Sequence, residues 1–393
     1  MRKLLLGLPL LLLANIAAAQ HQHGGLQPES FTATPAFGPD GTLWLVRGSK
    51  DRVLVVRSAD LGKSFSAPVS VTPGPINIDW GPDARPRIAV DHAGNLIVTY
   101  AIFQDQRFNG RAFFTRSTDN GATFVPPQPL TADGTSQRFE TVAIDPAGKV
   151  FAAWLDKRNA ATKKYAGAAL AFAWSQDGSR FGDTDIAADN TCECCRLAVA
   201  FAGPGRPAIL FRNIFAGSIR DHAVMTFKDA VTPGPPRRVS VDNWKIEACP
   251  HHGPALAIAV DGSYHAAWFT GGTARQGLFY ARADNEGTAF SEPRALSLPN
   301  RQPARPYLLA MGSDVHLVWK EFDGTKAQVR WQVSHDSGRS WSAAHIVADT
   351  GDASDHPLLV SDKSASDADK TRVFLSWLTK AEGYRLIPLE DKP

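Results

Sequence analysis

The residues best suited to chemistry in this 393-residue sequence are its four cysteines and the two histidines that stand beside one of them. Three cysteines fall in the segment 191–196, and the fourth falls in 247–253, just ahead of the two histidines. Thiolates and imidazoles together bind soft or borderline cations, which makes Cu(I) and Zn(II) the first candidates. The predicted metal ligands are Cys192, Cys194, Cys195, Cys249, His251 and His252.

Other outcomes for the same residues stay open. Four cysteines allow three disulfide connectivities, and Cys249 bonded to one of the other three would staple two distant segments together. The adjacent Cys194 and Cys195 would form a strained vicinal disulfide. One disulfide, with the remaining sulfurs and imidazoles as ligands, is a mixed alternative. A redox centre is a third, because a thiolate near histidine and Arg196 has a lowered pKa.

A repeat of about fifty residues positions these segments. Each unit is an apolar stretch, a turn that contains glycine, and a second apolar stretch that ends near Trp or Tyr. Seven copies begin near Thr34, Pro86, Glu140, Leu197, Pro254, Pro306 and Pro357. The two cysteine-containing segments directly precede the fourth and fifth copies. They therefore occupy equivalent positions in neighbouring units.

A second element follows several of these copies. Three stretches share one eight-residue pattern, with Ser first, Asp third, Gly fifth and an aromatic residue last: Ser58–Phe65, Ser117–Phe124 and Ser334–Trp341. The aspartate accepts hydrogen bonds from its own turn, and the glycine adopts the positive φ that the turn requires. We therefore predict structural roles for Asp60, Asp119 and Asp336.

This pattern resembles the Asp-box (BNR) repeat of the sialidase superfamily, S-x-D-x-G-x-[ST]-[FW]. The resemblance implies an all-β fold, a β-propeller of four-stranded blades in which the box joins the third and fourth strands, away from the active site. Seven inner-strand units favour seven blades, with six as the alternative. The sequence predicts one propeller domain over 31–393. The last unit shows three strands, and the segment around Leu26 to Phe31 is the candidate for its fourth.

In a propeller, the connections that lead into the first strand of each blade converge on one mouth of the central channel, where ligands usually bind. The resemblance implies a glycoside hydrolase that uses three arginines, a Tyr nucleophile activated by Glu, and an Asp. The weak candidates on these connections are Arg85 (or Arg87), Arg138, Glu140, Arg305 and Tyr307. The F/Y-R-I-P motif of sialidases is missing from the first unit, and sialidases have no such cysteine and histidine segments. We therefore expect a metal or redox centre, with an arginine-lined glycosidase or glycan-binding site as the alternative.

The first 19 residues have the form of a bacterial signal peptide. Arg2 and Lys3 precede the apolar run Leu4–Leu13, and Ala17–Ala19 provides the cleavage site. Residues 20–30 form a predicted N-terminal tail, and no later segment is apolar enough to span a membrane. A periplasmic or secreted location follows, which permits disulfides and favours copper over zinc. A net charge of +3 gives no basis for a nucleic-acid partner, so the expected ligands are a metal ion, a small molecule or a glycan.

Overall fold

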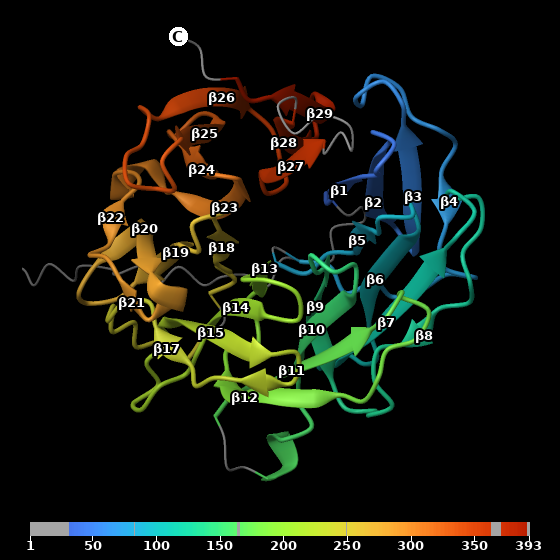
Figure 1. Cartoon of the computed structure of the whole chain (residues 1–393), viewed down its shortest axis with the longest axis horizontal. Helices are drawn as coiled ribbons and strands as arrows, with labels where there is room; N and C mark the ends of the chain where they lie inside the picture. Colours follow the sequence, from blue (N-terminus) through green and yellow to red (C-terminus); the bar gives the residue numbers. More distant parts are fainter. Residues whose placement is uncertain (1–30, 82, 163–165, 249, 363–370, 391–393) are drawn as a thin grey trace, which may run out of the picture.

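The computed structural model describes residues 31–81, 83–162, 166–248, 250–362 and 371–390. Seven antiparallel sheets stand in a ring around a central channel, with each innermost strand next to the channel (Figure 1). This is the predicted β-propeller, and it has seven blades rather than six.

The first three blades contain four strands each, in sequence order from the channel outward. Blade 1 comprises β1 (Thr34–Phe37), β2 (Leu43–Ser49), β3 (Arg52–Ser58) and β4 (Val69–Ser70). Blade 2 comprises β5 (Arg87–Val90), β6 (Leu96–Phe103), β7 (Gly110–Ser117) and β8 (Gln128–Pro129). Blade 3 comprises β9 (Gln137–Ile144), β10 (Val150–Asp156), β11 (Ala168–Ser175) and β12 (Asp185–Thr191), with the 3₁₀ turn η1 (Ala160–Thr162) between β10 and β11.

Blades 4 and 5 have an outer strand that is split into two short pieces, both paired with the third strand. Blade 4 comprises β13 (Ala198–Phe201), β14 (Pro207–Arg212), β15 (His222–Asp229), β16 (Thr232–Pro233) and β17 (Arg237–Arg238). Blade 5 comprises β18 (Ala255–Ile258), β19 (Tyr264–Gly271), β20 (Gln276–Asp284), β21 (Ala289–Phe290) and β22 (Arg294–Ala295), with η2 (Asn285–Gly287) before β21.

The last two blades differ in their number of strands. Blade 6 comprises β23 (Ala304–Met311), β24 (Asp314–Phe322), β25 (Ala327–Ser334) and β26 (His345–Thr350), preceded by η3 (Pro299–Arg301). Blade 7 comprises β27 (Leu358–Asp362), β28 (Arg372–Thr379) and β29 (Gly383–Pro388), so three strands lie in the described part of the chain. The predicted fourth strand around Leu26 to Phe31 falls almost wholly outside that part, and Phe31 itself is not in a strand.

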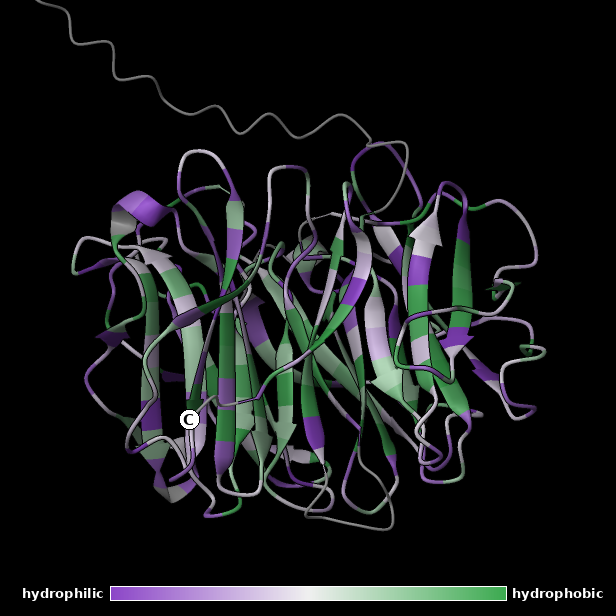
Figure 2. Ribbon diagram, turned by 90° about the horizontal axis from the view of Figure 1, so that it is seen from above, coloured by the Kyte–Doolittle hydropathy of each residue, from purple (hydrophilic) through white to green (hydrophobic). Residues whose placement is uncertain are grey.

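The core lies between the blades, where apolar side chains of adjacent sheets pack together. Hydrophobic residues are spread over the strands of the ring (Figure 2). The tryptophans that end the repeat units are fully buried on the second strands: Trp154, Trp268, Trp319 and Trp377. Their indole N–H groups are satisfied, because Trp154 donates to Asp156 at 3.0 Å and Trp319 donates to Glu321 at 2.8 Å. Burial of each large ring therefore leaves no unpaired donor behind.

The Asp-box turns connect the third and fourth strands, as the resemblance implied. In the box of blade 2, the Ser117 hydroxyl donates to Asp119 at 2.8 Å and accepts the Gly121 N–H at 3.0 Å. Asp119 also accepts the backbone N–H and the hydroxyl of Thr123. The same four bonds recur in the boxes of blades 1 and 6.

The ring closes between blades 1 and 7, which belong to opposite ends of the described chain (Figure 1). The carboxylate of Asp355, just ahead of blade 7, accepts the Ala33 N–H at 3.0 Å and the guanidinium of Arg85 at 3.0 Å. On the outer side, the ring of Phe65 packs edge-on against Tyr384 at 5.6 Å between centroids. Side chains thus join the two end blades.

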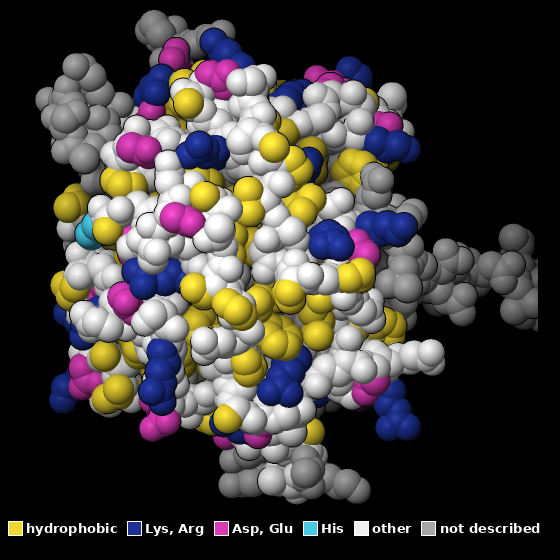
Figure 3. Space-filling model, turned by 90° about the vertical axis from the view of Figure 1, so that its right-hand side faces the viewer, with side chains coloured by type: hydrophobic (Ala, Val, Ile, Leu, Met, Phe, Trp, Pro, Cys, Tyr) yellow, Lys and Arg dark blue, Asp and Glu magenta, His cyan; other side chains and the backbone are white. Residues whose placement is uncertain are grey.

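Two further observations bear on partners. No helix in the described ranges is long and apolar enough to cross a membrane. On the side of the ring shown in Figure 3, acidic and basic side chains are interspersed, in keeping with the small net charge. The predicted signal peptide and the tail over 20–30 lie outside the described residues.

Candidate metal centre at the mouth of the channel

One carboxylate, ahead of blade 2, binds residues of three further blades at the mouth where the chain enters the first strands. Asp83 lies on the connection from blade 1 to blade 2 and is 1% exposed. It accepts bonds from Arg196 at 2.8 Å, from Arg305 at 3.0 Å and from the backbone N–H of Gly253 at 2.8 Å. Burial alone would raise the pKa of Asp83, but the charges of Arg196 and Arg305 hold it below its usual value.

Three thiols cluster directly beside this carboxylate network. Cys192, Cys194 and Cys195 are each at most 2% exposed, and their sulfur atoms all lie within 4.8 Å of one another. The Sγ atoms of Cys192 and Cys194 are 3.5 Å apart, too far for a bond of about 2 Å. All three are free cysteines. Such a group offers three soft ligand atoms to one metal ion.

Basic side chains favour the ionised form of one of these thiols. The Cys194 and Cys195 thiols donate to Cys192, and these bonds, with the charges of Arg212 and Arg220, hold the pKa of Cys192 well below its usual value. The Nη1 atom of Arg220 lies 3.2 Å from the Cys192 sulfur. Burial raises the pKa of Cys195. The surroundings of Cys192 therefore favour its ionised form over its neutral form.

The two predicted histidines lie at the same mouth. Gly253, which follows them, packs so tightly on Arg196 that a Cβ atom would overlap its side chain. His252 stacks on Phe269 at 4.1 Å between centroids, and Arg305 donates to the carbonyl oxygen of His251. The 192–196 and 251–253 segments are therefore adjacent, although they are far apart in sequence.

The imidazoles are in the form that binds metals. Burial lowers the pKa of His252 to about 3 and also lowers the pKa of His251, so both rings are neutral at pH 7. The Nδ1 atoms of both rings are buried without a hydrogen-bond partner. Neither ring belongs to the compact group of three sulfurs. Cys249, the sixth predicted ligand, lies outside the described residues.

Sequence reasoning missed three residues around the thiols. Arg212 ends β14, and its guanidinium donates to the carbonyl oxygen of His252 at 3.0 Å. Arg220 contacts Cys192, and His222 is fully buried beside His252. These residues flank the connection between the second and third strands of blade 4. In an antiparallel blade, that connection reaches the same mouth as the connections into the first strands, so the repeat pattern indicates that its residues can contribute to a site there.

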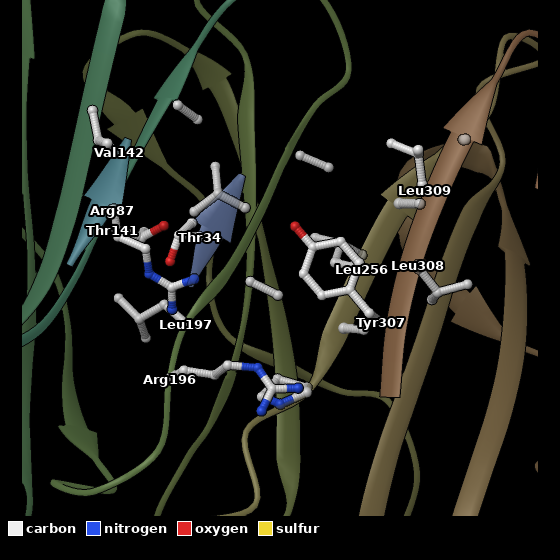
Figure 4. A pocket seen from close by; sticks show the side chains of 18 of the residues that line it. Thr34, Arg87, Thr141, Val142, Arg196, Leu197, Leu256, Tyr307, Leu308 and Leu309 are labelled. Carbon is white, nitrogen blue, oxygen red and sulfur yellow. The ribbon is translucent and has the colours of Figure 1, made fainter. Parts of the chain in front are cut away.

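The arginines predicted for a glycosidase site already have carboxylate partners. Arg85 pairs with Asp355, Arg138 with Asp79, and Arg305 with Asp83. Glu140 is 3% exposed, and burial raises its pKa to about 8. Tyr307 faces the channel rather than this network (Figure 4). The geometry therefore brings these candidates to the mouth and channel but leaves Arg85, Arg138 and Arg305 already neutralised.

Comparisons with known proteins place the fold. No protein-family model matches the chain, and no curated protein matches it. A solved ulvan lyase of polysaccharide lyase family PL25 superposes with a TM-score of 0.56 at 11% identity, covering 93% of this chain and 95% of the lyase. The BP39L lectin from Burkholderia pseudomallei superposes with a TM-score of 0.63 at 13% identity, covering 92% of this chain and 99% of the lectin. The Hadza microbial sialidase Hz136 superposes with a TM-score of 0.53 at 14% identity, covering 92% of this chain and 66% of the sialidase. The chain is thus a seven-bladed propeller of sialidase-like fold.

Proposed function

We propose that this protein is a metal-binding propeller whose centre is the thiol group of Cys192, Cys194 and Cys195. The observation that carries the proposal is the approach of three buried sulfur atoms to within 4.8 Å of one another. The three cysteines also pack in the apolar core of blades 3 and 4, but packing alone does not require that their sulfur atoms approach one another beside two arginines. That approach suits a cation that turns the thiols into ligands.

Copper(I) is the favoured metal. Three thiolates satisfy Cu(I), whereas Zn(II) requires a fourth ligand, which His251, His252 or Cys249 would have to provide. Thiolates bound to Cu(I) keep a net negative charge, and Arg212 and Arg220 compensate that charge. The neutral His251 and His252 rings, with unpaired Nδ1 atoms, are the additional ligands that we propose for zinc.

Metal titration tests this proposal. We expect reduced protein, purified without oxygen, to bind one equivalent of Cu(I) more tightly than Zn(II) in competition with chelators. Cys192→Ser and Cys195→Ser should each weaken binding at least a hundredfold. Met225→Leu is the control, because it removes a buried sulfur from the same core while conserving volume. Reduced protein that binds neither metal stoichiometrically contradicts the proposal.

A redox centre is the competing role for the same thiols, and thiol counting distinguishes the two. Metal binding is supported if the thiols of Cys192, Cys194 and Cys195 are protected from reagents and air in the metal-loaded protein and are recovered as free thiols when the metal is removed. Reversible loss of two thiols with mild oxidants, without any metal, supports a dithiol centre. We also propose export after cleavage behind Ala19, which N-terminal sequencing of the protein from a periplasmic extract would check.

Glycan binding is the second candidate function. Its support is the solved lectin and ulvan lyase of similar fold, together with a central cavity lined in part by Arg87 and Tyr307. Cleavage is less favoured, because Arg85, Arg138 and Arg305 are held by carboxylates. Turnover of a fluorogenic sialoside that disappears in Arg138→Ala would restore the hydrolase interpretation.

A further inference from the structure

Arg212 is more deeply buried than any other arginine that the structure describes. It ends β14 and is 1% exposed. Its two Nη atoms donate to three backbone carbonyl oxygens, those of Arg220 at 2.8 Å, His252 at 3.0 Å and Phe269 at 3.2 Å. The guanidinium also lies 4.5 Å from the ring centroid of Trp244. All of these partners are neutral groups, and the Nε atom has no hydrogen-bond partner among the described residues.

The other buried arginines of the mouth have acidic partners. Arg85 pairs with Asp355, and Arg196 pairs with Asp83. Within the described ranges, Arg212 forms no ion pair with a carboxylate. A guanidinium that is removed from water without a nearby anion is strongly unfavourable. The charge of Arg212 therefore has to be balanced by a group other than a carboxylate.

Metal-bound thiolates can supply the missing negative charge. The charge of Arg212 acts on the thiols of Cys192 and Cys195 and favours the ionised form of each. Arg220 adds a second positive charge, because its Nη1 atom lies 3.2 Å from the Cys192 sulfur. The network beside the thiols does not offset these charges, because Asp83 is one carboxylate that pairs with two arginines. The surroundings of the three sulfurs therefore carry an excess of positive charge.

Charge neutrality at the thiols then depends on the valence of the bound metal. Three thiolates carry three negative charges, and Arg212 and Arg220 carry two positive charges. A monovalent cation makes the total zero, whereas a divalent cation leaves one positive charge buried, which is costly. We propose that the charges of Arg212 and Arg220 make the thiol centre selective for a monovalent soft cation, Cu(I) or Ag(I), over a divalent one. This inference rests on the metal centre proposed above and names the residues that set its charge preference.

Competition titrations of the reduced full chain with Ag(I) and Cd(II) test this selectivity. Both ions are soft and bind thiolates, so a change in the ratio of their affinities reports on charge. In Arg212→Met this ratio should fall at least about tenfold, because a unit charge within about 10 Å contributes that much at an effective dielectric constant of about 20. Arg212→Lys keeps the charge and should retain most of the ratio. A purely structural role of Arg212 would instead weaken both metals alike and leave the ratio unchanged.

A second variant keeps the test decisive if Arg212→Met does not fold. Arg220→Gln removes the partly exposed guanidinium that contacts Cys192, and the ratio of Ag(I) to Cd(II) affinity should fall there too. Arg206→Gln is the control, because it removes one positive charge from a surface pair with Glu286 and should keep the wild-type ratio. A wild-type ratio in Arg212→Met, or in Arg220→Gln if the former does not fold, overturns this inference and leaves the metal centre in place. Wild-type protein that binds neither ion overturns both.

Discussion

The two faces of the propeller are built on opposite principles. On the Asp-box face, the same four hydrogen bonds recur in three blades, and every box aspartate has its partners. At the opposite mouth, buried charges cross between blades, and several imidazole and guanidinium nitrogens have no partner. The recurring, fully paired box aspartates form a structural device, whereas the irregular burial of charged groups at the mouth is typical of a binding site.

Backbone conformation shows the same contrast. On the Asp-box face, positive φ falls on the residue before the box glycine, such as Asn120, and on the glycine itself. Near the mouth, it falls on Phe139, His251 and Arg305, and of these Phe139 and Arg305 are residue types that seldom adopt it. The inner strands β9 and β23 shift register at two of these residues. Strain at the mouth thus accompanies the placement of Glu140 and Tyr307.

The largest effect should come from the charge that holds the mouth together. Asp83→Asn leaves Arg196 and Arg305 buried without a counter-charge, and should reduce the free energy of unfolding by about 3–5 kcal/mol. The control is Asp261→Asn, because the carboxylate of Asp261 is partly exposed where it pairs with Arg282 and Arg339, and its loss should reduce the free energy of unfolding by less than about 1 kcal/mol. Equal losses in urea denaturation would remove the distinction between the faces.

The second effect concerns pH. Because the folded pKa of Glu140 is about 8, above the ordinary value of 4.5, the folded state holds a proton that the unfolded state releases between these values. The contribution of Glu140 to the free energy of unfolding should therefore be fully present below pH 4.5. It should be lost as the pH rises from there through 8. In Glu140→Gln this loss of stability disappears. If the free energies of unfolding of wild type and variant depend on pH in the same way, Glu140 is not the cause of this loss of stability.

A third prediction separates two costs of replacing glycine on the Asp-box face: the steric clash of the added Cβ atom and the strain of a positive φ. Gly121 has a φ of +73°, and a Cβ atom there would lie 2.6 Å from the Trp44 ring. Gly41 has a φ of +81° with nothing within 4 Å of that position. Gly121→Ala should cost about 2–3 kcal/mol and Gly41→Ala about 1 kcal/mol, measured by thermal unfolding. A Gly121→Ala loss no greater than that of Gly41→Ala would mean that the box does not pack on the preceding blade.

The smallest effect is expected for a single box aspartate. Asp119→Ala removes the bonds from Thr123 and Ser117 in a solvent-exposed turn, so the melting temperature should fall less than in Asp83→Asn. Cu(I) affinity should not change, because the box lies on the face away from the thiols. Weakened copper binding in this variant would show that the two faces are coupled.

Sequence reasoning went furthest where structure is local. The box motif contains all of its own hydrogen-bonding partners within eight residues, and seven repeat units gave seven blades. The convergence of the 192–195 and 251–253 segments also followed from their equivalent positions in neighbouring repeats. These inferences required only the period of the chain.

The ion pairs across the mouth could not be predicted from the repeat. Asp83 and Arg305 are 222 residues apart, and nothing in their spacing indicates that they meet. The same holds for Arg212 and Arg220, whose side chains reach the thiols from another connection of blade 4. An arginine near a predicted site looks available in the sequence, and only the fold shows which ones are neutralised.

The contact of Asp355 with Ala33 and Arg85 has a mechanical consequence. Every other pair of neighbouring blades is linked by the covalent chain, but in the part of the chain that the structure describes this joint consists of noncovalent contacts. Pulling on the two ends of the polypeptide would load that seam first. A circular permutant cut at another connection would move the seam elsewhere, and Asp355 would then reinforce a joint that a peptide bond already secures.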